Sequence, residues 1–370
     1  MQGQASARLK LVAIGGGTGL STLLSGLKRY VARDYQSAEM KDSPCLLEML
    51  TAVVTVTDDG GSSGRLREEF QILPPGDIRN CMVALSEDER LLARLFQYRF
   101  GGKGELRDHS FGNLFLTALT DVTGDFLEAI KLSSEVLAIK GRIFPSTMSD
   151  VVLSARLSDG TIVQGESNIS QSRIPIAKLS LEPSVCHPLP ETLDAIKEAD
   201  IITLGPGSLF TSILPNLLVE GIPRAISSSS AVRIYICNIM TQPGETDGFT
   251  AEDHVRTIFR YAPELKLDYV LVNSRPISQQ MKQKYLADGA VQVGLELFGN
   301  NVAAIEKPEQ LSLLMNNEYN GSAAQVIFAD LLEEKELVRH EAHKLSRLIF
   351  DIYQLDRAKA LLSTEAAQRK

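Results

Sequence analysis

Residues Leu9–Leu20 read LKLVAIGGGTGL, and this stretch decides the fold. The apolar run from Leu11 to Ile14 is typical of a buried strand, and leucines at helical spacing begin at Leu20, directly after the glycines. Glycines let the backbone pass close to an anion, and the free N–H groups and dipole of a helix start favour negative charge there. The stretch therefore predicts a site for a nucleotide or another phosphate. The expected contacts are Gly16, Gly17, Thr18 and Gly19.

The glycine turn alone leaves the ligand open. Leu20 stands where the third glycine of a dinucleotide-binding G-x-G-x-x-G motif would fall, and no Lys-Ser/Thr pair follows, as a P-loop requires. A tight strand-to-helix turn without a ligand is the structural alternative. A nicotinamide-dependent dehydrogenase is a further functional alternative, but only this turn supports it.

Composition argues against several classes of protein. The chain has 370 residues, a formal net charge of −8 and a pI near 5.3, whereas a general nucleic-acid binder needs a basic surface. Its four cysteines are far apart and form no C-x-x-C pair, which argues against a zinc ribbon, a redox motif and a disulfide framework. No run approaches about 18 apolar residues, so we expect no signal peptide, no membrane span and a cytoplasmic location.

Short apolar segments alternate with amphipathic ones along the chain. This alternation predicts an α/β fold with a doubly wound, mainly parallel sheet. The further strands expected in this sheet are Leu50–Val56, Ala199–Leu204, Val232–Asn238, Tyr269–Val272 and Ala324–Phe328. We expect a single α/β domain over residues 9–352, followed by a C-terminal tail over 353–370.

The pattern changes near residue 141. Val151–Leu157 and Thr161–Val163, joined through Asp159-Gly160, are typical of a β-hairpin with a type I′ turn. We therefore expect residues 141–190 to form a small hairpin insertion or subdomain.

Four of the expected strands end in polar, glycine-rich loops. These loops are Gly15–Gly19, Asp58–Arg65, Gly205–Ser208 and Asn238–Thr246. Ligands of open α/β sheets bind at the carboxyl ends of the strands, so four such loops at one edge describe a single large cleft. Simple helix capping by Ser208 is the alternative for the third loop.

The loop after the second strand carries two carboxylates. Asp58 and Asp59 could hold Mg²⁺ together with ligand phosphates, or bind the hydroxyls of a ribose or sugar. A turn pair that accepts hydrogen bonds from loop N–H groups is the structural alternative. Asp77 follows a Pro-Pro-Gly turn and is expected as the N-cap of the next helix.

Basic and neutral side chains complete the candidate site. Arg65 suits a diphosphate, because a guanidinium fork matches its oxygens. His109 stands at a helix start beside a glycine-rich loop, where it could contact phosphate or transfer protons, and a capping role is the alternative. Asp58, Asp59 and His109 are the candidate catalytic residues. The remaining candidate contacts are Ser62, Ser63, Arg79, Asn80, Asn113, Gly205, Gly207, Ser208 and Asn238.

Several long segments together resemble one family. They are AIGGGTGLSTLLSGLK, TAVVTVTDDGGSSGRLR, PPGDIRNCMVAL, HSFGNLFLTAL, GPGSLFTSILPNLLV, CNIMTQPGETDGFTAEDHV and VRHE. On these segments the chain closely resembles the gluconeogenesis factor family, the YvcK-like branch of the CofD-like superfamily. The resemblance implies a Rossmann-like three-layer α/β/α sandwich and a cytoplasmic protein. It also implies binding of a uridine-diphosphate sugar, notably UDP-N-acetylglucosamine, and a regulatory role in cell shape and envelope synthesis during gluconeogenic growth.

The transferase branch of the superfamily supplies the alternative function. Its 2-phospho-L-lactate transferases move a phospholactyl group from a guanosine-diphosphate donor to a deazaflavin with the help of a divalent metal. Asp58 and Asp59 match the aspartate pair of that active site, and Gly205–Ser208 matches a nucleotide-phosphate loop. However, GGSSGRLR is the gluconeogenesis-factor form of the loop. We therefore expect a regulatory nucleotide-binding protein, with the ligand a nucleotide sugar or a dinucleotide.

The sequence leaves partners open. No segment identifies a protein partner or an oligomeric state. The last helix carries Leu345, Leu348, Ile349 and Ile352 on one face, which could pack on its own domain or on a neighbouring copy. A homo-oligomer therefore stays open as an alternative.

Overall fold

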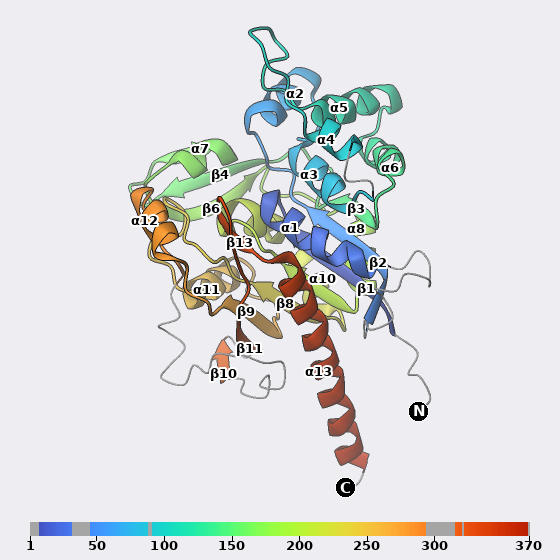
Figure 1. The fold of residues 1–370 in the computed structure, drawn as a ribbon, viewed down its shortest axis with the longest axis vertical. Helices are drawn as coiled ribbons and strands as arrows, with labels where there is room; N and C mark the ends of the chain where they lie inside the picture. Colours follow the sequence, from blue (N-terminus) through green and yellow to red (C-terminus); the bar gives the residue numbers. More distant parts are fainter. Residues whose placement is uncertain (1–6, 32–44, 88–90, 294–314, 320–321, 369–370) are drawn as a thin grey trace.

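An eight-stranded sheet runs through the centre of the computed structural model (Figure 1). The structure describes residues 7–31, 45–87, 91–293, 315–319 and 322–368. The strand order is β10-β11-β9-β8-β7-β1-β2-β3, and every neighbouring pair is parallel except the antiparallel pair of β10 and β11. The bounds are β1 Ala7–Gly15, β2 Cys45–Val54, β3 Arg142–Pro145, β7 Ile201–Leu204, β8 Val232–Ile236, β9 Tyr269–Asn273, β10 Met315–Tyr319 and β11 Ser322–Ala329. The predicted α/β fold is confirmed.

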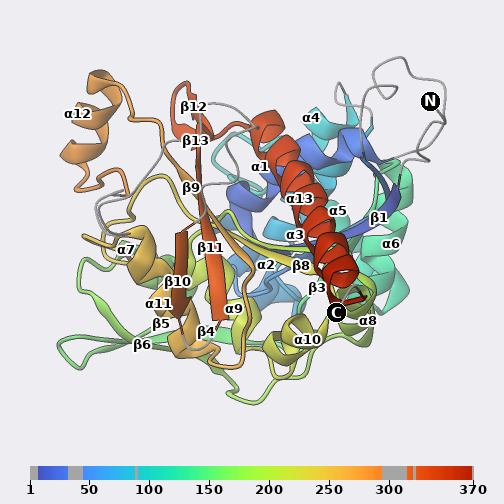
Figure 2. The same cartoon turned by 90° about the horizontal axis from the view of Figure 1, so that it is seen from below.

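Helices cover both faces of this sheet. Helices α1, α3 and α13 pack together on one face, and α8, α9, α10 and α11 pack on the other (Figure 2). The bounds on the first face are α1 Gly17–Leu27, α3 Gly76–Leu85 and α13 Ala342–Gln368. Those on the second face are α8 Pro190–Glu198, α9 Leu214–Leu218, α10 Ile222–Ser228 and α11 Ala251–Tyr261. The chain is therefore a three-layer α/β/α sandwich.

The remaining helices lie around the rim of the sandwich. Helices α2, α4, α5 and α6 form a lobe beyond one end of it, and α7 and α12 lie on another side (Figure 1). Their bounds are α2 Gly61–Phe70, α4 Leu92–Gln97, α5 Phe111–Thr123, α6 Phe126–Val136, α7 Glu166–Gln171 and α12 Gln279–Ala287. Within the described ranges, no helix has both the length and the apolar character needed to cross a bilayer.

The strand order reverses at β1. From β1 the chain adds β2 and β3 on one side, and from β7 it adds β8, β9 and β11 on the other. Leu11 is accordingly paired with Leu50 and with Ile201. Such a switch point opens a crevice outside the carboxyl ends of the two central strands. The glycine turns after β1 and β7 lie at that crevice.

The last helix packs on its own chain. Leu345, Ile349 and Ile352 are fully buried, and the rings of Tyr30 and Phe350 lie 4.5 Å apart. A Cβ on Gly26 of α1 would lie 2.4 Å from the carbonyl oxygen of Ala342, so only glycine allows this close packing. The apolar face of α13 therefore finds its partner within the molecule. Helix α13 continues through position 353, where we expected the tail to begin.

A three-stranded antiparallel sheet carries the predicted hairpin. Its strands are β5, β4 and β6 in that order, with the bounds β4 Val152–Leu157, β5 Ile162–Gln164 and β6 Ile176–Glu182. The turn differs from the type I′ prediction. Leu157 donates its N–H to the carbonyl of Thr161, so the loop holds three residues, and Gly160 alone takes a positive φ of 89° there. This is a three-residue loop with glycine at the left-handed position.

The segment after Asp59 was expected as a loop, and that expectation was wrong from Gly61 onward. Residues Gly61–Phe70 form helix α2, which Gly61 enters with a φ of 45°. Leu66 is the one large apolar side chain that this helix buries. A helix with so little apolar periodicity leaves no amphipathic signal in the sequence.

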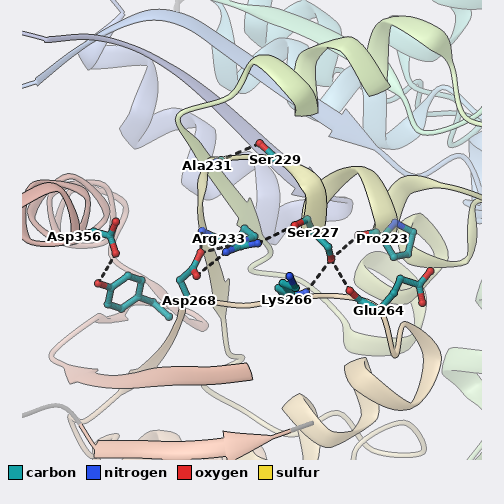
Figure 3. Close-up of polar contacts among 10 residues, drawn as sticks. Pro223, Ser227, Ser229, Ala231, Arg233, Glu264, Lys266, Asp268 and Asp356 are labelled. Atoms are coloured by element: carbon teal, nitrogen blue, oxygen red, sulfur yellow. Dashed lines mark hydrogen bonds and ion pairs between the residues drawn. The ribbon is translucent and has the colours of Figure 1, made fainter. Parts of the chain in front are cut away.

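A polar network lies at the amino ends of strands β8 and β9, at the end of the sheet opposite the glycine turns (Figure 3). Arg233 donates from Nε and Nη2 to the two carboxylate oxygens of Asp268, at 2.7 and 2.8 Å, and from Nη1 to the carbonyl of Ser227. These residues tie α10 to the starts of β8 and β9. The network lies at the amino ends of the strands, away from the glycine turns.

Candidate functional site

The two glycine turns at the switch point touch through their backbones. A Cβ on Gly19 would lie 2.4 Å from the carbonyl oxygen of Pro206, and a Cβ on Gly207 would lie 3.5 Å from the carbonyl oxygen of Gly16. Gly17 takes a φ of 62°, which favours glycine. The turns after β1 and β7 therefore form one continuous surface that larger side chains would push apart.

A cavity of about 570 Å³ opens at these turns. Seven of the predicted contacts line it, namely Gly16, Gly17, Thr18, Gly19, Gly207, Ser208 and Asn238. The rest of the wall includes residues of α7, α12 and the hairpin of β12 (Leu332–Glu334) and β13 (Val338–His340). In both views β13 lies between α1 and α12 (Figures 1 and 2). Three of the four predicted loops thus meet at one cavity.

Glu245 connects two of these loops to α7. This residue is 5% exposed and belongs to the loop after β8. Its carboxyl group accepts hydrogen bonds from the hydroxyls of Ser208 and, at 3.1 Å, Ser170. Ser208 also caps the next helical turn by accepting from the N–H of Thr211. Burial raises the pKa of Glu245 above its ordinary value. The expected capping role of Ser208 is therefore observed together with its place on the cavity.

Asp77 does not cap its helix, contrary to our prediction. Helix α3 begins at Gly76 with Pro75 as its N-cap, and no side chain caps it. The buried Asp77 carboxyl accepts from the N–H of Gly17, and a Cβ on Gly16 would lie 2.6 Å from its Oδ2. Burial first, and the neighbouring Asp58 second, raise the pKa of Asp77 to about 7. The first glycine turn therefore rests on a carboxyl group that is partly protonated at neutral pH.

The aspartate pair lies beside the cavity and does not line it. Asp58 accepts from the N–H of Gly60 at 2.9 Å, and Asp59 accepts from the N–H of Ser167 at 2.8 Å. The Asp58 bond matches the turn-capping alternative, whereas Asp59 accepts from the first turn of helix α7, 108 residues away in the sequence. Among the residues that the structure describes, no three His, Cys, Asp or Glu side chains are grouped so that they could hold a metal ion. A metal at this pair would therefore need ligand phosphates to complete its coordination.

Five of the other candidates form a separate polar cluster between α2, α3 and α5. Ser62 accepts from Asn113 Nδ2 at 3.2 Å and from the N–H of Ser110 at 3.3 Å. Because Ser62 already accepts two hydrogen bonds, its hydroxyl donates its own proton to His109 Nδ1, at 3.0 Å. Burial first, and then Arg65, lower the pKa of His109. The cluster's members among our candidates are Ser62, Ser63, Arg79, His109 and Asn113. Asn80 joins it by accepting from Arg79 at 2.8 Å.

Two candidates have other surroundings. Arg65 is exposed and donates to the carbonyls of Arg107, at 2.6 Å, and Glu105, at 3.3 Å, so it holds the 100–108 loop. Gly205 takes a φ of 82°, and a Cβ there would lie 2.8 Å from Ile213 Cδ1. Neither residue lines the cavity. Arg65 fastens a loop in this structure, and Gly205 shapes the turn.

Sequence reasoning did not select Glu166, Ser170, Tyr285 or His340, all of which line the cavity. Helix α12 buries none of its residues, so Tyr285 stands in a segment without an apolar pattern. His340 belongs to the VRHE segment, which carried the resemblance but no assigned role. Of the eight buried side-chain polar atoms that lack a hydrogen-bond partner in the described part of the chain, two belong to this cavity. They are Glu166 Oε2 and His340 Nε2.

Comparison with known proteins identifies the family. Residues 11–309 match the family model of 2-phospho-L-lactate transferase CofD. The gluconeogenesis factor of Bacillus subtilis is 42% identical over 93% of this chain and 98% of its own length, and that of Halalkalibacterium halodurans is 43% identical over 92% and 95%. The crystal structure of a UPF0052-family protein from Bacillus halodurans has a TM-score of 0.78 and 43% identity, and the match covers 93% of this chain and 99% of that one. With these matches over nearly its whole length, the chain belongs to the gluconeogenesis factor family and is built on a CofD-type domain.

Proposed function

We propose that the cavity binds a nucleotide sugar of the UDP-N-acetylglucosamine type and that the protein is a regulatory binding protein. The contact between the two glycine turns carries this proposal. Both turns start helical segments, whose free N–H groups favour anions, and they open on one cavity of about 570 Å³. That volume suits a small-molecule ligand. A diphosphate at the turns would leave the nucleoside and sugar for the walls formed by α7, α12 and β13.

The charges around the cavity fit a ligand with few negative groups. Asp77 and Glu166 lie near the first turn, and burial raises the pKa of both carboxyls. Arg339 brings a cationic side chain to the opposite wall of β13 residues. A Mg²⁺ ion held by Asp58 or Asp59 together with the phosphates would offset further ligand charge. We extend the proposal to this ion and to a cytoplasmic location.

The physiological role comes from the relatives. Two proteins that match this chain over more than 90% of both lengths are described as gluconeogenesis factors. We infer that ligand occupancy of the cavity couples sugar-nucleotide supply to cell shape and envelope synthesis during gluconeogenic growth. The expected phenotype of a deletion is a growth or shape defect on gluconeogenic carbon that the wild-type chain restores.

Calorimetric titration with UDP-N-acetylglucosamine tests the binding. We expect saturable binding to the wild type. Thr18→Glu places a carboxylate on an exposed, cavity-lining position of the first turn and should weaken binding about 10-fold or more through charge repulsion. Ser230→Glu adds the same charge at an exposed position before β8, at the other edge of the sheet, and should leave binding unchanged. Absence of binding to the wild type at millimolar ligand would reject the proposal.

Phospholactyl transfer is the second candidate. The match to the CofD family model over residues 11–309 favours it, together with the aspartate pair beside the glycine turns. Incubation with a guanosine-diphosphate phospholactyl donor, a deazaflavin acceptor and Mg²⁺ tests it directly. Deazaflavin that carries the phospholactyl group, formed together with guanosine monophosphate and absent with the Asp58→Asn variant, would establish the transfer. A reaction that gives no product would leave the regulatory function.

A further inference from the structure

Helix α7 is a wall of the cavity and is held at both of its ends. It runs over Glu166–Gln171 and places Glu166 and Ser170 on the cavity. These two side chains are four residues apart and therefore lie on one face of the helix, while Ile169 is fully buried. A helix as short as α7 is unstable by itself, so its position depends on the contacts made at its ends.

The start of α7 is capped from a distant part of the chain. Its N-cap residue is Gly165, which has no side chain to accept from the free N–H groups of the first turn. The carboxylate of Asp59, from the loop after β2, accepts instead from the N–H of Ser167 at 2.8 Å. Ser167 is the second residue of α7, whose N–H an N-cap side chain ordinarily binds, and the helix dipole also favours a negative charge there. Asp59 therefore provides the cap that Gly165 cannot.

Asp59 and Gly165 are in direct contact. Gly165 takes a φ of 89°, and a Cβ on it would lie 2.0 Å from Asp59 Oδ2. The carboxylate therefore fills the space beside Gly165 with Oδ2 while Oδ1 accepts from Ser167. Any residue larger than glycine at position 165 would push the carboxylate away from α7.

The end of α7 is held by the loop after β8. Ser170 donates its hydroxyl proton to Glu245 at 3.1 Å, and Glu245 also accepts from Ser208 of the second glycine turn. A Cβ on Gly244 would lie 1.8 Å from the carbonyl oxygen of Ser172, the residue that follows α7. Helix α7 thus bridges the loops after β2 and β8, and Asp59 ties it to the first of them.

We propose that Asp59 is a positioning residue that caps α7 and thereby holds the wall with Glu166 and Ser170 at the distance from the glycine turns that a bound nucleotide sugar needs. This inference rests on the proposed function. The role needs only a hydrogen-bond acceptor at position 59, whereas a magnesium ligand there needs the carboxylate charge. The two roles therefore predict different behaviour for asparagine, whose amide oxygen accepts a hydrogen bond without carrying the charge.

The first test compares Asp59→Ala with Asp59→Asn in calorimetric titrations with UDP-N-acetylglucosamine, in buffer with Mg²⁺ and in buffer with EDTA. Asp59→Ala should bind about 10-fold more weakly than the wild type in both buffers, and Asp59→Asn should recover most of this loss. Equal losses in the two variants would overturn the inference, and a loss confined to the Mg²⁺ buffer would identify a metal ligand instead. Wild-type affinity of Asp59→Ala would overturn it as well.

A matched pair of glycine variants displaces the carboxylate without changing Asp59. Gly165 and Gly160 both take a φ of 89°, so alanine strains the backbone similarly at both positions, but a Cβ on Gly160 meets nothing within 4 Å. Gly165→Ala should weaken binding about as much as Asp59→Ala does, and Gly160→Ala should keep the wild-type affinity. Equal affinities of the two glycine variants would overturn the inference.

Hydrogen exchange tests the capping of α7 without a ligand. Amide exchange across α7 should accelerate about 10-fold in Asp59→Ala and Gly165→Ala and stay near the wild-type rate in Asp59→Asn and Gly160→Ala. Unchanged exchange in folded Asp59→Ala would overturn the inference. Wild-type protein that does not bind UDP-N-acetylglucosamine would instead overturn the proposed function, and the exchange rates would still decide whether Asp59 holds α7.

Discussion

Substitution of Gly19 by alanine tests whether the cavity depends on contact between the two glycine turns. Built on the backbone of Gly19, a Cβ lies 2.4 Å from the carbonyl oxygen of Pro206 and 3.0 Å from Cα of Gly207, whereas ordinary contacts begin at 3.4 Å. The obstructing atoms are backbone, so no side chain can rotate away. The turns must therefore separate by about 1 Å, which a close-packed interior resists.

Two opposing effects set the magnitude. Alanine is favoured over glycine inside a helix by about 1 kcal/mol. Overpacking against a rigid surface costs about 1–3 kcal/mol or more. We therefore expect Gly19→Ala to lower the free energy of unfolding by about 0–2 kcal/mol. Binding of UDP-N-acetylglucosamine should weaken by about 10-fold or more, because the phosphates need both turns at their present distance.

Urea unfolding and calorimetric titration of the same preparations measure both effects. Gly101→Ala is the control, because a Cβ on Gly101 meets nothing within 4 Å. That variant should match the wild type in affinity and lose little stability. If Gly19→Ala were as stable as Gly101→Ala and bound the ligand with wild-type affinity, the turns would not need to touch and the reasoning would be refuted.

Three further changes test other parts of the structure. Asp77 has a pKa of about 7 in the folded chain against an ordinary 3.8, so the folded state holds its proton more tightly, and the stability that Asp77 contributes should fall as pH rises from about 4 to 7. Asp77→Asn removes this contribution, so the difference in unfolding free energy between wild type and variant should change over that pH range in parallel urea curves, and a constant difference would contradict the burial of the charge. Glu245→Ala removes the acceptor of two serine hydroxyls and should cost about 1–3 kcal/mol of unfolding free energy and weaken ligand binding in calorimetry. Arg233→Ala leaves Asp268 without its guanidinium partner and should cost about 1–3 kcal/mol in urea unfolding while the affinity stays constant. Changed affinity would mean that this distant edge acts on the site.

The sheet was predictable because the sequence of each central strand is a nearly continuous run of apolar residues. The strands expected at Ala199–Leu204 and Tyr269–Val272 correspond to β7 and β9, whose residues are all buried. Helix α2 escaped prediction because it buries mainly Ser62, Ser63 and Leu66. Edge strand β3 escaped it because its sequence, Arg-Ile-Phe-Pro, has only two adjacent apolar residues before a proline and so lacks a strand-like apolar run. Apolar periodicity therefore predicts what packs on the core and misses what polar contacts hold.

The glycine turns of the candidate site were predictable from the sequence, but the residues that form the cavity walls were not. Glycine-rich turns after buried strands have a mechanism that links them to phosphate, and the turns after β1 and β7 do line one cavity. The walls depend on tertiary contacts that no local pattern encodes. Asp77 fits an N-cap by its position, yet its carboxyl turns to Gly17. Tyr285 and His340 reach the cavity only through tertiary structure, because β13 packs against α1 and α12 contributes to the same cavity wall.

The position of β1 between β2 and β7 has a consequence for biosynthesis. The first glycine turn leaves the ribosome early, but the strand that pairs with Leu11 on its other side begins at Ile201, and the wall that holds His340 begins at Val338. A partly synthesised chain therefore has no complete pocket. A ligand bound there would stabilise only finished molecules, and its cellular concentration would add to their stability by mass action without rescuing truncated ones.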